Sequence, residues 1–153
     1  MIVTLSELEN TLPNGLHDAE IHRIAVDYVQ RLVTIDLSVF VGEVDAPLEK
    51  REAYRKAALV ISGLQFISIE SPDARYPFAE SGTLRVDLCD KKADLDLNLL
   101  NTLPANAFCE SLFVYEWNAF VHLAGLGAEI QWTGPTVYLN ERIHILPGET
   151  IDL

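Results

Sequence analysis

The stretch LVTIDLSVFVG, residues 32–42, carries the clearest structural signal in this chain. Its apolar side chains recur at every second position: Val33, Ile35, Leu37, Val39 and Val41. Most of the residues between them are polar or charged. A period of two places these sets on opposite faces of a β-strand. Residues 32–42 therefore predict a strand with one buried face and one largely solvated face.

The same alternation continues on both sides of this strand. Residues 19–28 alternate as well, and Val29-Gln30-Arg31 predicts the turn of an antiparallel hairpin. Residues 54–69 form a long β pattern, and Ser62-Gly63 in its middle predicts a bend where the strand crosses between sheet regions. Residues 113–123 alternate as one strand, 128–132 return, and Thr133-Gly134-Pro135 predicts a further turn.

Helical signals are few. Thr4 followed by Glu7 is a capping-box pattern, and Leu5, Leu8 and Leu12 lie on one side of a helix over residues 4–12. Residues 94–103 fit a helix or a strand equally well. We expect one domain over residues 1–153. Its fold class is mainly β, an antiparallel sandwich or open barrel of about 7–8 strands with the N-terminal helix and room for a second near 94–103.

The charge limits the classes of partner. With 11 Lys+Arg against 23 Asp+Glu, the chain has a formal net charge of −12. We therefore expect no nucleic-acid binding, because phosphate contacts need clustered Lys and Arg. Anionic membrane surfaces are disfavoured for the same reason. A basic protein partner fits, with contacts expected in the 43–53 loop and the acidic stretch 87–96.

Targeting signals and cysteine use indicate a cytoplasmic protein. The start, MIVTLSELENTL, has neither the basic nor the apolar region of a signal peptide. The longest apolar runs are interrupted before they reach the length of a membrane helix. Cys89 and Cys109 form no CxxC, so we expect them to be reduced and structural.

The first group of candidate site residues is His17, Asp18, Glu20 and His22. A His-Asp dipeptide is half of the metal signature of HD-type phosphohydrolases, but those enzymes are helical and need further His and Asp residues. On a straight strand Glu20 and His22 share a face and could form a pair. In the simpler interpretation, Asp18 caps the turn after Asn14-Gly15.

The second group is Glu116, Asn118, Phe120 and His122. On one strand these residues would share a face, where they would line a groove for a ligand or partner. An ordinary solvated face is the alternative.

Metal, cofactor and catalytic motifs are not found in the sequence. Asp87, Asp90, Asp94 and Asp96 invite a calcium interpretation, but the loop lacks the required glycine. There is no GxSxG, no GxGxxG and no P-loop. We therefore predict no metal site, no cofactor and no catalytic residue, and we lean against an enzyme.

Two short stretches carry a resemblance to a known family. LPNGLHDA at residues 12–19 and EWNAF at residues 116–120 resemble a family of small uncharacterised bacterial proteins, some of which are similar to immunity proteins of polymorphic toxin systems. The resemblance implies a bacterial cytoplasmic protein that binds another protein and has no active site.

Two functions remain open at this point. The first is a non-enzymatic protein-binding module of unknown specificity, with a toxin-immunity-like inhibitor as its specific form. The second is a small-molecule-binding protein or enzyme with a site in a barrel or sandwich cleft near His17 and His122. A homodimer paired through exposed sheet edges is a further alternative.

Overall fold

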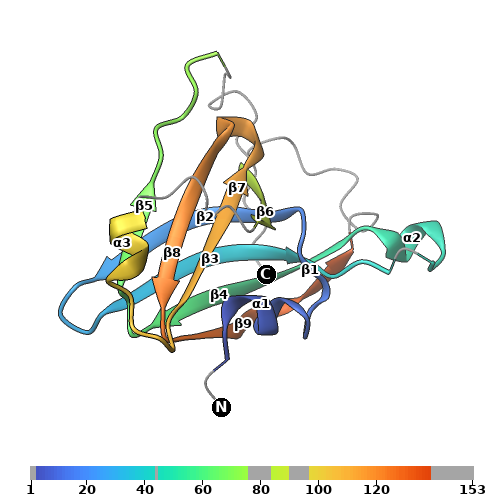
Figure 1. Ribbon diagram of the computed structural model, residues 1–153. Helices are drawn as coiled ribbons and strands as arrows, with labels where there is room; N and C mark the ends of the chain where they lie inside the picture. The colour runs from blue at the N-terminus through green and yellow to red at the C-terminus, as the bar shows by residue number, and fades with distance from the viewer. Residues whose placement is uncertain (1–2, 44, 76–83, 90–96, 139–153) are drawn as a thin grey trace.

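The described residues form one antiparallel sheet of eight strands, in the order β5-β8-β7-β6-β2-β3-β4-β9 (Figure 1). The computed structural model describes residues 3–43, 45–75, 84–89 and 97–138. The predicted mainly β, antiparallel fold is confirmed, and the sheet is not closed into a barrel. The elements are α1 (Leu5–Glu9), β1 (Pro13–Leu16), β2 (Ala19–Asp27), β3 (Leu32–Phe40), α2 (Leu48–Arg51), β4 (Ala53–Ser62), β5 (Phe66–Ile69), β6 (Leu84–Cys89), α3 (Leu97–Asn101), β7 (Phe108–Val114), the 3₁₀ turn η2 (Tyr115–Trp117), β8 (Ala119–Gly125) and β9 (Gly127–Tyr138).

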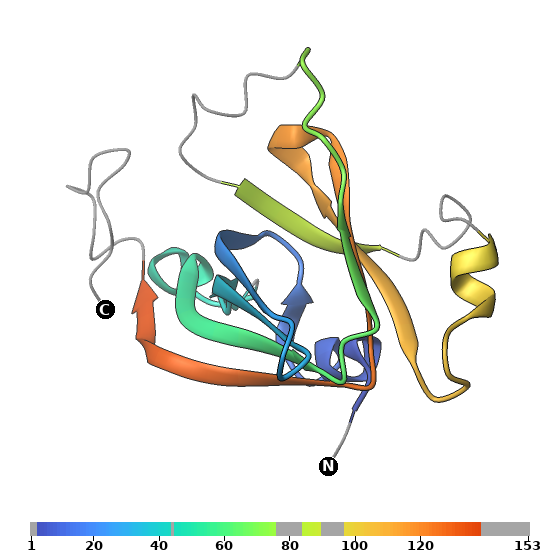
Figure 2. The ribbon, with the colours of Figure 1, turned by 90° about the vertical axis from the view of Figure 1, so that its left-hand side faces the viewer.

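A sharp corner folds the sheet into two arms (Figure 2). The β4–β5 segment pairs with the β8–β9 segment on both sides of this corner. Backbone hydrogen bonds continue across it, from Leu126 N to Ser62 O (2.9 Å) and from Gln65 N to Ala124 O (2.8 Å). Gly63 adopts a φ of +57° at the bend. The bend predicted at Ser62-Gly63 is therefore confirmed.

The core lies between the two arms. The alternating residues of β3 supply its centre, since Val33, Ile35, Leu37 and Val39 are at most 1% exposed. Helix α1 adds Leu5 and Leu8 to the same cluster. Burial of each large side chain contributes about 1.5–3 kcal/mol, so the period-two pattern of residues 32–42 is a major part of what holds the fold together.

The predicted N-terminal capping box is present in α1. Glu7 N donates to the Thr4 hydroxyl oxygen (3.1 Å), and Thr4 N donates to the Glu7 carboxylate (2.8 Å). The predicted hairpin is confirmed too, because β2 and β3 pair antiparallel. A bulge at His22 interrupts their register, with Ile21 opposite Leu37 and Arg23 opposite Asp36.

Two local predictions are wrong. Residues 113–123 do not form one strand, because η2 and a left-handed Asn118 (φ 46°) separate β7 from β8. Thr133-Gly134-Pro135 is not a turn between strands. It is a bulge inside β9, where Arg55 and Ala57 pair with Thr136 and Trp132. Pro135 is tolerated there because β9 is the last strand in the sheet order.

The ambiguous region resolves as helix where it is described. Residues Leu97–Asn101 form α3, while residues 94–96 of the predicted helix lie outside the described residues. No helix in the described ranges is long and apolar enough to span a membrane.

Candidate functional site

Asp87 on β6 connects the first predicted group to the second. His17 Nδ1 lies 3.1 Å from Asp87 Oδ2, and the Tyr115 hydroxyl donates to the same oxygen (3.1 Å). His17 Nε2 also lies 3.4 Å from Asp18 Oδ2. Asp18 has a φ of +57°, which turns the chain sharply from β1 into β2. The N-terminal turn and the β7–β8 connection therefore meet at Asp87.

A hollow of about 360 Å³ opens beside this contact; we call it the Asp87 pocket. Register explains how it forms, because Asp87 pairs with Phe113 and Phe113 pairs with Phe120, which puts all three on one face. The Phe113 ring centre is 5.2 Å from that of Tyr115 and 5.1 Å from that of Phe120. The pocket is lined by Asp87, Leu88, Cys89, Phe113, Tyr115 and Phe120.

Further charged side chains lie next to Tyr115, which lines the Asp87 pocket. Arg85 Nε donates to Glu116 Oε1 (2.8 Å), and Arg85 N donates to Glu116 Oε2 (2.8 Å). The guanidinium carbon of Arg85 lies 5.9 Å from the Tyr115 ring centre. Burial raises the pKa of Glu20, and the nearby charge of Glu116 raises it further. Acidic groups therefore outnumber the one arginine in this contact network.

The hydrogen bond to Asp87 raises the pKa of His17 above its usual value. Desolvation opposes the shift, while the charges of Asp18, Asp87 and Glu9 add to it. Burial and the contact with Asp87 raise the pKa of Tyr115, so this hydroxyl stays protonated at neutral pH. The arrangement therefore favours the protonated form of His17 next to the Asp87 carboxylate.

His122 belongs to a separate, buried hydrogen-bond chain. Its Nδ1 lies 2.6 Å from Ser111 Oγ, and its Nε2 lies 3.1 Å from Glu70 Oε2. Ser111 is 1% exposed and His122 2%. The residue types match a Ser-His-Glu triad, but this serine is too buried to attack a substrate. We therefore interpret the Ser111–His122–Glu70 hydrogen bonds as part of the structure of the sheet.

Sequence reasoning found His122 and missed both of its partners. Ser111 faces His122 across the β7–β8 hairpin, and Glu70 follows β5. Only the hairpin pairing, hidden by the assumption of a single strand over 113–123, could have pointed to Ser111.

The remaining predicted residues serve local structure. His22 Nε2 lies 2.8 Å from Ser38 Oγ, and burial lowers the pKa of His22. The Asn118 amide donates to Asp73 Oδ2 (3.3 Å). Phe120 contacts both the Asp87 pocket and the hydrogen-bond chain of His122, because its ring centre lies 5.1 Å from that of Phe113 and its ring stacks on His122 at 5.7 Å.

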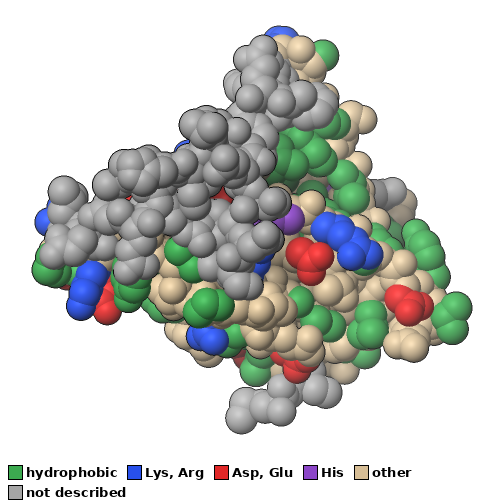
Figure 3. Space-filling model, turned by 180° about the vertical axis from the view of Figure 1, so that it is seen from behind, with side chains coloured by type: hydrophobic (Ala, Val, Ile, Leu, Met, Phe, Trp, Pro, Cys, Tyr) green, Lys and Arg blue, Asp and Glu red, His purple; other side chains and the backbone are tan. Residues whose placement is uncertain are grey.

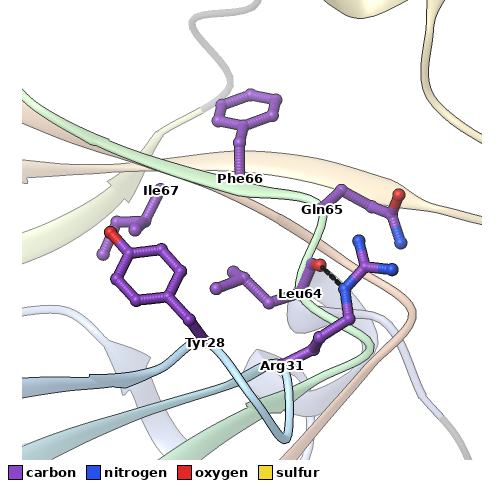
Figure 4. A pocket seen from close by; sticks show the side chains of 6 residues that line it. All are labelled: Tyr28, Arg31, Leu64, Gln65, Phe66 and Ile67. Atoms are coloured by element: carbon purple, nitrogen blue, oxygen red, sulfur yellow. Dashed lines mark hydrogen bonds between the residues drawn. The ribbon is translucent and has the colours of Figure 1, made fainter.

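A second surface, which sequence reasoning missed, surrounds the tip of the β2–β3 hairpin. Tyr28 is 82% exposed and Val29 94%, and Ile69 on β5 is 51% exposed. A pocket of about 280 Å³ lies between the tip and β5 (Figure 4). We name this the hairpin–edge surface and define it by its exposed and pocket-lining residues: Tyr28, Val29, Arg31, Phe66, Ile67 and Ile69.

Hydrogen bonds within the turn and to Leu64 hold the hairpin tip in place. Asp27 Oδ1 accepts hydrogen bonds from Val29 N and Gln30 N, both at 3.0 Å. Arg31 has a φ of 55°, and its Nε donates to Leu64 O (3.0 Å), as Figure 4 shows. Leu64 N in turn donates to Arg31 O (2.9 Å). The exposure of Tyr28 and Val29 is therefore built into the turn.

Charge is mixed over the face seen in Figure 3. On the described part of this face, acidic and basic side chains lie close to one another, with hydrophobic side chains between them. The expected contact segment 43–53 contains α2 with Lys50 and Arg51 in its last turn. In the expected acidic stretch 87–96, residues 90–96 lie outside the described residues. The net charge alone therefore does not mark a binding surface.

Comparison with protein families, with curated proteins and with solved structures gave no match to this chain. Within the described ranges, no group of three or more His, Cys, Asp or Glu side chains is placed to hold a metal ion.

Proposed function

We propose that this chain is a non-enzymatic protein-binding module whose contact surface is the hairpin–edge surface. The single observation that carries this proposal is the exposure of Tyr28 (82%) and Val29 (94%) on a turn held by hydrogen bonds. Adjacent exposed apolar side chains beside a pocket are typical of sites that bind other molecules. Tyr and Arg are also the residue types that contribute most energy to protein interfaces.

The edge of β5 supports the same proposal. β5 is the first strand in the sheet order, so among the described strands it pairs only with β8. Glu70 N donates to Phe120 O (3.0 Å), and alternation along an antiparallel pair then turns the backbone groups of Ile67 and Ile69 away from β8. Such an edge can accept a strand from a partner.

The partner class follows from charge. A net charge of −12 raises the association rate with a basic protein and makes binding sensitive to salt. An inhibitor of the immunity type, which the LPNGLHDA and EWNAF stretches suggest, is one form of such a module.

Quantitative affinity capture tests the proposal. The bait carrying Tyr28→Ser and Val29→Ser should lose a basic protein that the wild-type bait retains at low salt. Because both side chains are exposed, the variant should fold normally. Leu99→Ser is the matched control, since Leu99 is 37% exposed but lies on α3.

Equal capture by the double variant and the wild type would contradict the proposal. Light scattering on both chains separates a homodimer from a foreign partner, because only self-association would change the molar mass of the purified wild type.

The alternative function is a small-molecule site near His17 and His122, and the geometry leaves fewer residues that could form it. His122 is buried and both of its ring nitrogens have partners, so His17, Asp87 and Tyr115 remain available for a ligand. The specific observation that favours this second function is the Asp87 pocket, whose ligand class is argued next.

A further inference from the structure

The Asp87 pocket combines one carboxylate with three aromatic rings. Phe113, Tyr115 and Phe120 line it together with Asp87, and consecutive ring centres lie 5.1–5.2 Å apart. Both hydrogen bonds to Asp87 use Oδ2. Oδ1 has no partner among the described residues, and the Asp87 side chain is 34% exposed.

These groups together favour one class of ligand. Aromatic faces carry partial negative charge and attract organic cations, most strongly where a carboxylate adds a full charge. Arg85 is one nearby cation, and the Glu116 carboxylate neutralises it at 2.8 Å. A neutral apolar ligand would leave Asp87 Oδ1 without a partner, and the carboxylate would repel an anion.

We propose that the Asp87 pocket binds an organic cation of the alkylammonium class, held by the Asp87 carboxylate and the rings of Phe113, Tyr115 and Phe120. The site is independent of the hairpin–edge surface. Its ligand can be a small free amine or a lysine side chain of another protein, since both present the same ammonium chemistry.

His17 couples this site to pH. The charged and titratable groups facing His17 are Asp18 from its own turn, Asp87 from β6 and Glu9 from α1. Protonated His17 competes with the ligand for Asp87, so cation affinity rises as the pH rises through the pKa of His17. By reciprocity, a bound cation lowers the pKa of His17.

The test is an NMR titration of the whole chain with tetramethylammonium chloride, at ionic strength held constant with sodium chloride. We expect saturable shifts at the pocket residues and a lower His17 pKa. tert-Butyl alcohol, a neutral molecule of similar shape, should give neither. Asp87→Asn should weaken binding by about tenfold or more. Glu129→Gln on β9 removes the same charge far along the sheet order and should leave affinity unchanged.

Asp87 also accepts the hydrogen bonds of His17 and Tyr115, so Asp87→Asn could fail to fold. A second variant therefore tests the site without changing Asp87. Phe120→Leu keeps an apolar wall but removes one ring, and should weaken tetramethylammonium binding several-fold. Nα-acetyl-lysine methylamide distinguishes the two sources. Tighter binding than that of tetramethylammonium indicates a protein side chain, and weaker binding indicates a free amine.

Three results would overturn the proposal: no saturable shifts in the wild type, equal shifts with tert-butyl alcohol, or unchanged affinity in both Asp87→Asn and Phe120→Leu.

Discussion

His122 shows how a buried polar side chain is accommodated in this sheet. The Glu70 carboxylate can only accept a hydrogen bond, so His122 Nε2 carries the proton. In the neutral imidazole Nδ1 is then the acceptor, and the Ser111 hydroxyl, 2.6 Å away, is its donor. Both ring nitrogens are satisfied, although the side chain is only 2% exposed. This assignment makes Ser111 a stabilising partner of His122.

Removing the Ser111 hydroxyl should therefore destabilise the fold. Ser111→Ala leaves His122 Nδ1 buried without a donor, and we expect a loss of about 1–3 kcal/mol in the free energy of unfolding. Urea denaturation measures it. Ser68→Ala is the matched control, because Ser68 pairs with His122 from β5 but is exposed. Equal losses in the two variants would refute the assigned hydrogen bond.

The corner between β4 and β5 is the element on which the two-armed sheet depends. Gly63 has a φ of +57°, and a Cβ there would lie 2.7 Å from Leu126 Cγ. At Gly125, on the facing strand, a Cβ would lie 2.6 Å from Ile61 Cγ2. Close approach of the two bent segments therefore requires glycine on both of them.

Gly63→Ala should cost about 1–3 kcal/mol of unfolding free energy, through backbone strain and the clash with Leu126. A double-variant cycle with Leu126→Gly separates the two causes, since removing the whole Leu126 side chain, including the Cβ that would lie 2.8 Å away, relieves the clash but leaves the strain at residue 63. Chemical denaturation of the four chains gives the coupling energy. If Gly63→Ala proves neutral in both backgrounds, the corner does not need glycine.

Strand patterns predict this fold better than they predict its connections. Residues 32–42 and the Ser62-Gly63 bend could be read from the sequence because burial alternates and glycine marks the bend. The β7–β8 connection could not, because η2 and Asn118 contain neither Gly nor Pro. Asn tolerates the left-handed conformation, so a turn here gives no warning in the residue pattern.

The candidate site was only half predictable for a related reason. The sequence placed His17, Asp18 and Glu116 among the site residues. It singled out Asp87 only as part of the acidic stretch 87–96, and not as the residue that joins His17 to Tyr115. Asp87 reaches them through the pairing of β6 with β2 and β7, and such long-range register is not encoded in any local spacing. Likewise, exposure at Tyr28 and Val29 depends on where the hairpin tip ends relative to β5.

At the scale of the whole molecule, the excess of acid makes stability depend on pH. Burial raises the pKa of Glu9 and of Glu20, so the folded state binds protons more tightly than the unfolded state does. His17 acts in the same direction through its hydrogen bond to Asp87. His22 acts oppositely, because burial lowers its pKa.

We therefore expect the free energy of unfolding to be larger at pH 5.5 than at pH 8, which lie about 1 unit below and about 1.5 units above the ordinary histidine pKa. The contribution of His17 is fully present below its unfolded pKa and is lost as the pH rises through its higher folded pKa. Protonation of Glu9 and Glu20 removes a burial penalty as the pH falls, and a lower net charge reduces repulsion. The increase in the free energy of unfolding from pH 8 to pH 5.5 should stay below about 1 kcal/mol, since solvent screens the exposed His17–Asp87 pair. Urea denaturation at both pH values measures this increase.

Two histidine variants test the assignment. His17→Gln should shrink the difference in unfolding free energy between the two pH values. His22→Gln should enlarge it, because His22 is the group whose contribution to stability is lost as the pH falls. A larger free energy of unfolding at pH 8 than at pH 5.5 in the wild type would contradict the prediction.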